Sequence, residues 1–166
     1  MQDFYFMNDL TYYTKKSRIL PGDENNRKGA LWIGNYESAK ETTNLAAHNI
    51  RYVVSVMEKG MCKDLDRLYQ ANGITHLVLD ASDVSGYDIS KHFPKAIDFI
   101  ESSIMTGNVL VHCFAGISRS STVVLAYMMK TMGRPWRECL VLVQKHRSVV
   151  NPNHGFQQKL DKLQSA

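Results

Sequence analysis

One stretch, residues 108–132, constrains this chain more than any other. It starts with a short apolar run at residues 109–111, which is typical of a buried strand. It ends with residues 123–129, which are apolar on nearly all sides and therefore typical of a buried helix. The loop between them leads a strand into a helix, so its amides point toward the helix N-terminus. A site of that kind favours an anion.

This loop carries one cysteine, Cys113, and one arginine, Arg119, with five residues between them. Gly116 supplies the backbone freedom that lets successive N–H groups converge into an anion-binding nest. The planar guanidinium of Arg119 matches two oxygens of a phosphate. The same groups favour a thiolate, and such surroundings lower the pKa of a cysteine to roughly 3.5–7.5. The loop therefore predicts displacement at phosphorus through a covalent cysteinyl-phosphate intermediate.

The string from His112 to Ser120 reads His-Cys-Phe-Ala-Gly-Ile-Ser-Arg-Ser. It resembles the signature of the dual-specificity branch of the cysteine-dependent protein phosphatases. Four further strings resemble secondary markers of that family, namely Ser-Arg-Ile-Leu-Pro, Leu-Trp-Ile-Gly-Asn, Ala-Ser-Asp and Asn-Pro-Asn-x-Gly-Phe. The resemblance runs from about Ile19 to Leu163. An inert buried cysteine beside a core histidine is disfavoured, because the motif and its strand–loop–helix context agree.

The resemblance implies a role for each residue of the signature. Cys113 is the expected nucleophile and Arg119 the phosphate clamp. Ser120 is expected to donate a hydrogen bond to the sulfur, although it could equally be a helix N-cap. His112 is expected to order the loop rather than act as a base. The phosphate-binding set is expected to be Phe114, Ala115, Gly116, Ile117, Ser118 and Arg119.

Three residues outside the signature are also considered for the site. Asn153 resembles a family residue that buttresses the loop from a neighbouring turn, and an ordinary turn residue is an equal alternative. His146 and Arg147 could border the cleft, but a solvated helix end is the favoured interpretation for both.

The proposed chemistry needs a general acid opposite Cys113, because the departing oxygen must receive a proton. Asp83 is the favoured candidate, since it lies in a polar loop and in an Ala-Ser-Asp string like that of the family's acid loop. Asp80 directly follows an apolar run and is expected to pair locally. Asp88 is predicted to cap a helix.

Alternating strands and helices predict a single α/β domain with a mostly parallel five-stranded central sheet and helices on both faces. The signature loop then lies at the carboxyl end of a central strand. Residues 1–16 are predicted to form an N-terminal arm and residues 17–166 the catalytic domain. Strands are expected at residues 17–21, 30–34, 51–57, 74–79 and 109–111. Helices are expected at residues 37–47, 61–71 and 89–106, after the signature, after Pro135 and toward the C-terminus.

The bulk properties exclude several classes of protein. The chain has 166 residues and a net charge of +4, with no Lys/Arg block long enough to indicate nucleic-acid binding. No secretory signal or membrane span is predicted, so membrane insertion is not expected. The three cysteines, Cys62, Cys113 and Cys139, form no disulfide or zinc pattern. We therefore expect no metal, no cofactor and a reducing compartment, either cytoplasm or nucleus.

A phosphorylated protein is the favoured substrate, carrying phosphotyrosine and phosphoserine or phosphothreonine, and a kinase is one conceivable partner. Phosphoinositide phosphatases carry lysines within the loop, where this chain has Phe114 and Ile117. RNA 5′-phosphatases of the superfamily favour Asn before the arginine, where this chain has Ser118. A phospho-binding module with little turnover is a third alternative, disfavoured because Cys113 is present. Oligomeric state is not predicted.

Overall fold

The structure, a computed structural model, describes residues 16–22 and 28–166. A five-stranded sheet forms its centre, in the spatial order β1-β2-β5-β3-β4. The strands β2, β5, β3 and β4 are parallel, and β1 pairs antiparallel with β2. The strands are β1 (Lys16–Leu20), β2 (Leu31–Gly34), β3 (Ile50–Val56), β4 (Thr75–Leu79) and β5 (Asn108–His112). The predicted mostly parallel five-stranded sheet is confirmed.

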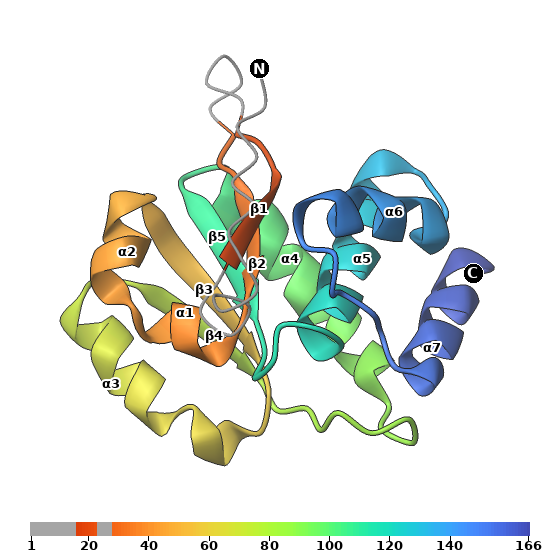
Figure 1. The fold of residues 1–166 in the computed structure, drawn as a ribbon, viewed down its shortest axis with the longest axis horizontal. Helices are drawn as coiled ribbons and strands as arrows, with labels where there is room; N and C mark the ends of the chain where they lie inside the picture. The colour runs from red at the N-terminus through yellow and green to blue at the C-terminus, as the bar shows by residue number, and fades with distance from the viewer. Residues whose placement is uncertain (1–15, 23–27) are drawn as a thin grey trace.

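Helices cover both faces of the sheet, as the sequence predicts (Figure 1). One face carries α1 (Tyr36–Lys40), α2 (Thr42–Ala47) and α3 (Lys63–Ala71). The other carries α4 (Phe93–Ile104), α5 (Arg119–Met132), α6 (Trp136–His146) and α7 (His154–Gln164). Two 3-10 helices, η2 (Lys59–Met61) and η3 (Ile89–His92), precede α3 and α4. The parallel strands therefore end together at one edge of a sheet that is covered on both sides.

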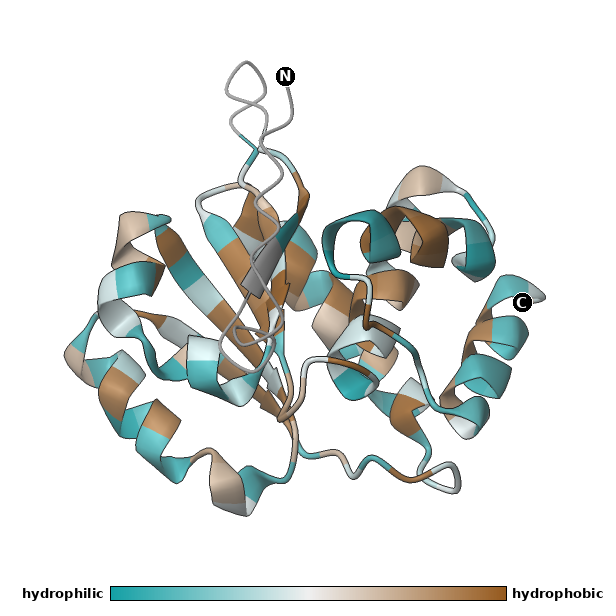
Figure 2. Cartoon of the chain, in the orientation of Figure 1, coloured by the Kyte–Doolittle hydropathy of each residue, from teal (hydrophilic) through white to brown (hydrophobic). Residues whose placement is uncertain are grey.

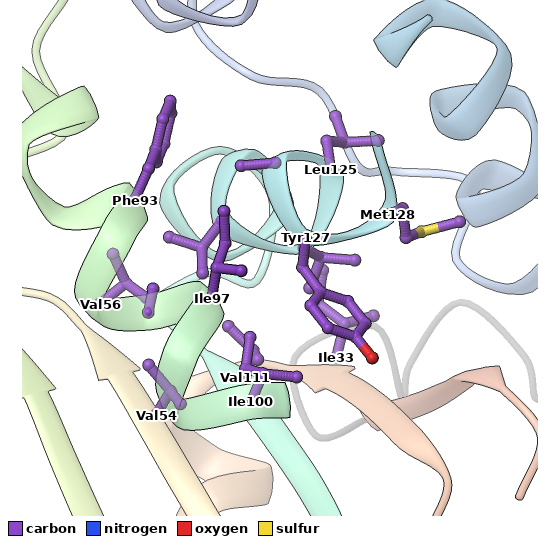
Figure 3. Close-up of a cluster of buried hydrophobic side chains, with 14 of the residues drawn as sticks. Ile33, Val54, Val56, Phe93, Ile97, Ile100, Val111, Leu125, Tyr127 and Met128 are labelled. Atoms are coloured by element: carbon purple, nitrogen blue, oxygen red, sulfur yellow. The ribbon is translucent and has the colours of Figure 1, made fainter. Parts of the chain in front are cut away.

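Alternating residues of β5 build two separate cores. Val109 and Val111 belong to the larger cluster under α4 and α5, whereas Leu110 belongs to the smaller one under α1–α3. Figure 3 shows side chains of α4 and α5 meeting those of the strands in the larger cluster. Helix α5 is buried along most of its length, as its apolar sequence predicts. In Figure 2, most residues of α7 are coloured as hydrophilic, in contrast to the apolar sequence of α5.

Three predicted helices differ from the structure at identifiable residues. The expected helix 37–47 is broken at Glu41, whose ψ of 73° is not helical. The break changes the phase of the next helix, α2, so Leu45 is buried while Thr43 and Ala46 lie at the surface. The expected helix 61–71 begins as η2, and the expected helix 89–106 begins as η3. Pro94 lies in the first turn of α4, where its missing N–H costs nothing.

Several helix ends follow the sequence signals. Asp88 accepts a hydrogen bond from the Ser90 backbone N–H at the start of η3. Gly133 has φ of +61° and ends α5 in the left-handed region. The predicted arm, residues 1–16, lies outside the described residues except for Lys16, which begins β1.

A core substitution tests the packing of α5. We expect Leu125→Ala to lower the free energy of unfolding by about 2–5 kcal/mol, because Leu125 is fully buried and its removal leaves a cavity. Urea denaturation measures this change. The matched control is Val141→Ala on α6, where the side chain is 55% exposed and the expected change is within about 0.5 kcal/mol. Equal effects of the two substitutions would contradict this description of the core.

Candidate active site

The signature loop occupies the turn between β5 and α5, at the carboxyl end of a central strand. Gly116 has φ of +69°, a conformation that residues with a side chain rarely adopt. A Cβ built there would lie 2.6 Å from the carbonyl oxygen of Gly34 and 2.8 Å from Nη2 of Arg147. Backbone conformation and space therefore both require glycine, and the loop closes tightly because that position is empty.

Hydrogen-bond donors converge on the sulfur of Cys113. The Gly116 N–H donates to Sγ over 3.2 Å, and the Oγ of Ser120 lies 3.2 Å from the same atom. Both Cys113 and Ser120 are buried, with Cys113 only 2% exposed. The N-cap position of α5 belongs to Ser118, so Ser120 contacts the sulfur from the first helical turn and is not the cap. This is the contact that the family resemblance predicts for Ser120.

Arg119 is held beside the loop by a residue that the sequence analysis missed. Its Nη1 donates to Glu58 Oε2 over 2.7 Å and to the Ala81 carbonyl over 2.9 Å. The guanidinium is buried, and its Nε–H has no hydrogen-bond partner among residues 16–22 and 28–166. Burial pushes the pKa of Glu58 upward, but its hydrogen bonds, including that from Arg119, outweigh burial and lower the pKa below its ordinary value. An acidic residue just after β3 was the available signal, since parallel strand ends share an edge.

Arg147 corrects a prediction. The sequence analysis favoured a solvated helix end, but the side chain is buried and only 6% exposed. Its Nε donates to the Gly116 carbonyl over 2.9 Å and its Nη2 to the Ala115 carbonyl over 3.2 Å. At the end of α6 the backbone of Arg147 turns from helical to extended, with φ of −143°. When the N–H groups of a nest point inward, its carbonyls point outward, and Arg147 satisfies two of them.

His112 lies beneath the loop and is fully buried. Its Nδ1 lies 2.9 Å from the carbonyl oxygen of Cys113, and its Nε2 lies 2.5 Å from Oγ of Ser55. Burial lowers the pKa of His112 to about 4, so the ring is neutral at physiological pH. In that state Nδ1 donates to the carbonyl while Nε2 accepts. His146, by contrast, is partly buried beyond the loop, where burial lowers its pKa.

The three candidate acids occupy different environments. Asp80 Oδ1 accepts a hydrogen bond from the Lys59 backbone N–H, and Asp88 pairs with Lys159 at 3.1 Å. Asp83 is exposed, and its Oδ1 accepts a hydrogen bond from Nδ2 of Asn153 over 3.0 Å. Asp83 is therefore the one of the three whose carboxylate is tied to the neighbourhood of the signature loop.

Asn153 makes that connection. It caps α7 by accepting from the Phe156 N–H, and its own backbone N–H donates to Oγ of Ser118 over 2.9 Å. One residue thus contacts both the signature loop and the loop that carries Asp83. Asn153 would act as a buttress through these contacts, and that role stays a prediction.

The exposed rim of the loop is aromatic. Phe114 is 52% exposed and stacks on Tyr36, with ring centroids 6.0 Å apart. The ammonium of Lys40 lies 4.9 Å from the centroid of the Tyr36 ring. Ile117, the other uncharged loop position, is partly buried.

Within residues 16–22 and 28–166, no group of three or more His, Cys, Asp or Glu residues is arranged to hold a metal ion. None of the helices in this part of the chain is long and apolar enough to cross a membrane.

A strand–loop–helix site of this kind defines a cysteine-dependent phosphatase class, and comparison with known proteins specifies the family. The family model for the dual specificity phosphatase catalytic domain matches residues 31–166. The chain therefore belongs to the dual specificity phosphatase family.

Individual relatives agree with this assignment. The chain is 39% identical over 148 residues to dual specificity protein phosphatase 15 of Rattus norvegicus, a match that covers 89% of this chain and 56% of that protein. It is 33% identical over 149 residues to dual specificity protein phosphatase 22 of Mus musculus, covering 89% and 73%. The chain spans about half the length of the first curated relatives that it matches.

Solved structures share the fold. The human tyrosine phosphatase-like serine/threonine/tyrosine-interacting protein superposes with a TM-score of 0.77 and 32% identity, over 92% of this chain and 97% of that chain. The crystal structure of DUSP15 gives a TM-score of 0.76 and 33% identity, over 92% and 89%.

A substitution in α7 tests the contact between this helix and the Asp83 loop. A Cβ at Gly155 would lie 1.9 Å from the carbonyl oxygen of Ser85. We expect Gly155→Ala to displace residues 82–86 and to cost about 1–3 kcal/mol of stability. Urea denaturation and the amide chemical shifts of residues 82–86 measure the two effects.

The matched control is Gly86→Ala in the same loop, where a Cβ meets nothing within 4 Å. Its stability and its shifts beyond the mutated residue should stay near those of the parent. If Gly155→Ala behaved like Gly86→Ala, the Asp83 loop would not depend on α7.

Proposed function

We propose that this chain is a protein phosphatase that hydrolyses phosphotyrosine and phosphoserine or phosphothreonine through a cysteinyl-phosphate intermediate. The observation that carries the proposal is the closed loop around Cys113, beside a buried Arg119 whose Nε–H has no partner in the part of the chain that the structure describes. A buried, unsatisfied charged donor is costly unless it binds an anion. The names of the family and of its members support the same activity.

The first step is transfer of the phosphoryl group to sulfur. The thiolate of Cys113 attacks phosphorus, the bond from phosphorus to the leaving oxygen breaks, and that oxygen takes a proton from Asp83. The loop amides and Arg119 hold the three non-bridging oxygens as charge shifts onto the leaving group. Glu58 shares Arg119 with the incoming phosphate and keeps the guanidinium oriented toward the loop.

The second step is hydrolysis. A water molecule attacks phosphorus and gives a proton to the Asp83 carboxylate, while the bond between sulfur and phosphorus breaks. Inorganic phosphate and the Cys113 thiolate are the products. The Oγ of Ser120, 3.2 Å from the sulfur, donates a hydrogen bond that stabilises the thiolate as it leaves.

The rim of the site supports a protein substrate. Phe114 and Ile117 contribute no charge to the loop, so a polyanionic head group would find no lysine there. The Phe114–Tyr36 stack instead offers an apolar surface to residues that flank a phosphorylated side chain. A phosphorylated protein, such as a kinase in a signalling pathway, fits this surface. All three cysteines are free, which supports a cytoplasmic or nuclear location.

The covalent step is tested by Cys113→Ser. We expect turnover of an aryl phosphate to fall by more than about 10³-fold, since a hydroxyl cannot replace the thiolate. Binding of a phosphotyrosine peptide, measured by calorimetry, should persist because the loop amides and Arg119 remain. The control is Cys139→Ala, which leaves the loop intact and should retain activity. Parent protein that binds the peptide but turns nothing over would identify a binding module instead.

The general acid is tested by a leaving-group series. We expect Asp83→Asn to slow hydrolysis of phenyl phosphates with poor leaving groups by about 10²–10⁴-fold and to spare activated aryl phosphates. Asp80→Asn is the matched control and should leave the leaving-group dependence unchanged, because Asp80 is bound to the Lys59 N–H. A steeper leaving-group dependence for Asp80→Asn would move the assignment to Asp80.

A further inference from the structure

A chain of hydrogen bonds crosses the sheet beneath the signature loop. Asp66 Oδ1 lies 2.6 Å from His76 Nδ1, and His76 Nε2 lies 2.7 Å from Ser55 Oγ. Ser55 Oγ lies 2.5 Å from His112 Nε2, and His112 Nδ1 lies 2.9 Å from the Cys113 carbonyl oxygen. We call these five residues, Asp66, His76, Ser55, His112 and Cys113, the relay.

The relay runs from the surface to the floor of the catalytic loop. The side chain of Asp66, on α3, is 56% exposed, whereas that of His76, on β4, is 6% exposed. Ser55 and His112 are fully buried. Ser55 on β3 is aligned with His112 on β5, so these side chains meet directly across two neighbouring strands.

Counting protons shows that the relay is one short when both histidines are neutral. Its two ends, the Asp66 carboxylate and the Cys113 carbonyl, can only accept hydrogen bonds. Four links between them therefore need four protons. Two neutral imidazoles and one hydroxyl supply only three, so one link is missing unless His76 or His112 carries an extra proton.

The extra proton belongs on His76. The pKa of His112, at about 4, keeps that ring neutral at physiological pH, whereas His76 faces a carboxylate. Protonated His76 donates to both Asp66 and Ser55, Ser55 then donates to His112, and His112 donates to the Cys113 carbonyl. Burial lowers the pKa of His76 below its ordinary value, although Asp66 acts in the opposite direction. The complete relay is thus the acid-side form, and it is lost as pH rises through the pKa of His76.

When His76 loses that proton, the effect reaches the loop through Ser55 and His112. Neutral His76 keeps its proton on Nδ1 toward Asp66 and turns a bare Nε2 toward Ser55. The single Ser55 proton cannot serve both His76 and His112. One of three links must then be lost: the His76–Ser55 bond, the Ser55–His112 bond, or, if His112 moves its proton to Nε2, its bond to the Cys113 carbonyl. We infer that the loss is shared among the three, so part of it reaches the loop.

Other ionisable groups around His76 do not supply the missing proton to the links. Tyr69 of α3 packs edge-on against His76 at 4.8 Å, and burial raises its pKa well above the physiological range. Cys62, which precedes α3, is a hydrogen-bond partner of Ser55, but burial raises its pKa to about 11, so it stays a neutral thiol and gives no proton to the four links. Burial is the main cause of the lowered pKa of His112, and the positive charges of His76 and Arg119 lower it further.

We propose that Asp66 and His76 are positioning residues that set the orientation of the Cys113–Phe114 peptide through Ser55 and His112. The C=O and N–H of a trans peptide point in opposite directions. A hydrogen bond from His112 to the Cys113 carbonyl therefore fixes where the Phe114 N–H points. That amide belongs to the phosphate-binding nest, so the relay makes the nest responsive to the protonation of a residue near the surface. The kinetic part of this inference rests on the proposed function.

The decisive variant is Asp66→Asn, because an asparagine amide can donate a hydrogen bond to His76 Nδ1. It supplies the fourth proton and leaves neutral His76 with its own proton on Nε2, directed at Ser55. The relay is then complete at every pH. The matched control is Asp64→Asn, an exposed acidic residue in the same first turn of α3.

Two measurements report on the relay. Nitrogen-15 NMR shows which ring nitrogen of His112 carries the proton between pH 5 and pH 8. This measurement does not require the protein to be enzymatically active. The ratio of kcat/KM between variant and parent, on an activated aryl phosphate that does not need Asp83, gives the effect on catalysis.

In the parent and in Asp64→Asn, we expect the His112 nitrogen signals to change as His76 titrates. In Asp66→Asn they should stay in the acid-side pattern throughout. The ratio of kcat/KM for Asp66→Asn over the parent should be near one on the acid side of the His76 titration and rise about three- to tenfold on its alkaline side, the contribution of one buried hydrogen bond. A ratio that does not vary with pH would overturn the kinetic part.

His112 signals that ignore His76 titration in the parent, or that titrate equally in Asp66→Asn, would overturn the relay itself. A parent with no turnover but with the expected NMR pattern would refute the proposed function and leave the relay supported. The two failures are therefore distinguishable.

Discussion

The whole site depends on the tight closure of the loop around Gly116. Its left-handed backbone turns the chain so that the Gly116 N–H reaches the Cys113 sulfur, and the missing Cβ lets Gly34 and Arg147 approach. The carbonyls that this turn exposes are bound by Arg147 from the far side. Inward N–H groups and outward carbonyls are two consequences of one backbone shape. The anion site is therefore built from α6 and β2 as well as from its own seven residues.

The sequence predicts the parts of this fold and site that local chemistry determines. The strands follow from alternating apolar runs, and the loop follows from the spacing of Cys113, Gly116 and Arg119. What it could not predict depends on contacts between distant segments. Glu58 and Arg147 reach the loop from other elements, and no local pattern separates them from ordinary surface charges. The helix similarly breaks at Glu41 because of a backbone angle at that residue, and a helical pattern in the sequence carries no information about that angle.

The two histidines His112 and His76 show the same difference between what a local motif predicts and what depends on contacts with distant segments. His112 is part of a recognisable string, and its ordering role can be expected from resemblance. His76 lies in an ordinary strand pattern. It is linked to the site only because β3 places Ser55 between the two histidine rings. The Ser55 hydroxyl, which can donate only one proton, joins His76 and His112. These two histidines are 36 positions apart in the sequence (112 − 76). Such a connection is a property of the sheet register rather than of the sequence around either histidine.

The position of Asn153 has a consequence for how the molecule is made. Asn153 joins the signature loop to the Asp83 loop, yet it comes after the five strands and six of the seven described α-helices in the chain. Because synthesis runs from the N-terminus, the five strands and the Cys113 loop are made before Asn153 and α7. Arg147, which binds the carbonyls of the Cys113 loop, and Asn153, which binds the Asp83 loop, both come late in the chain, after the five strands. The contact that holds the Asp83 loop therefore forms only after α7 has been made.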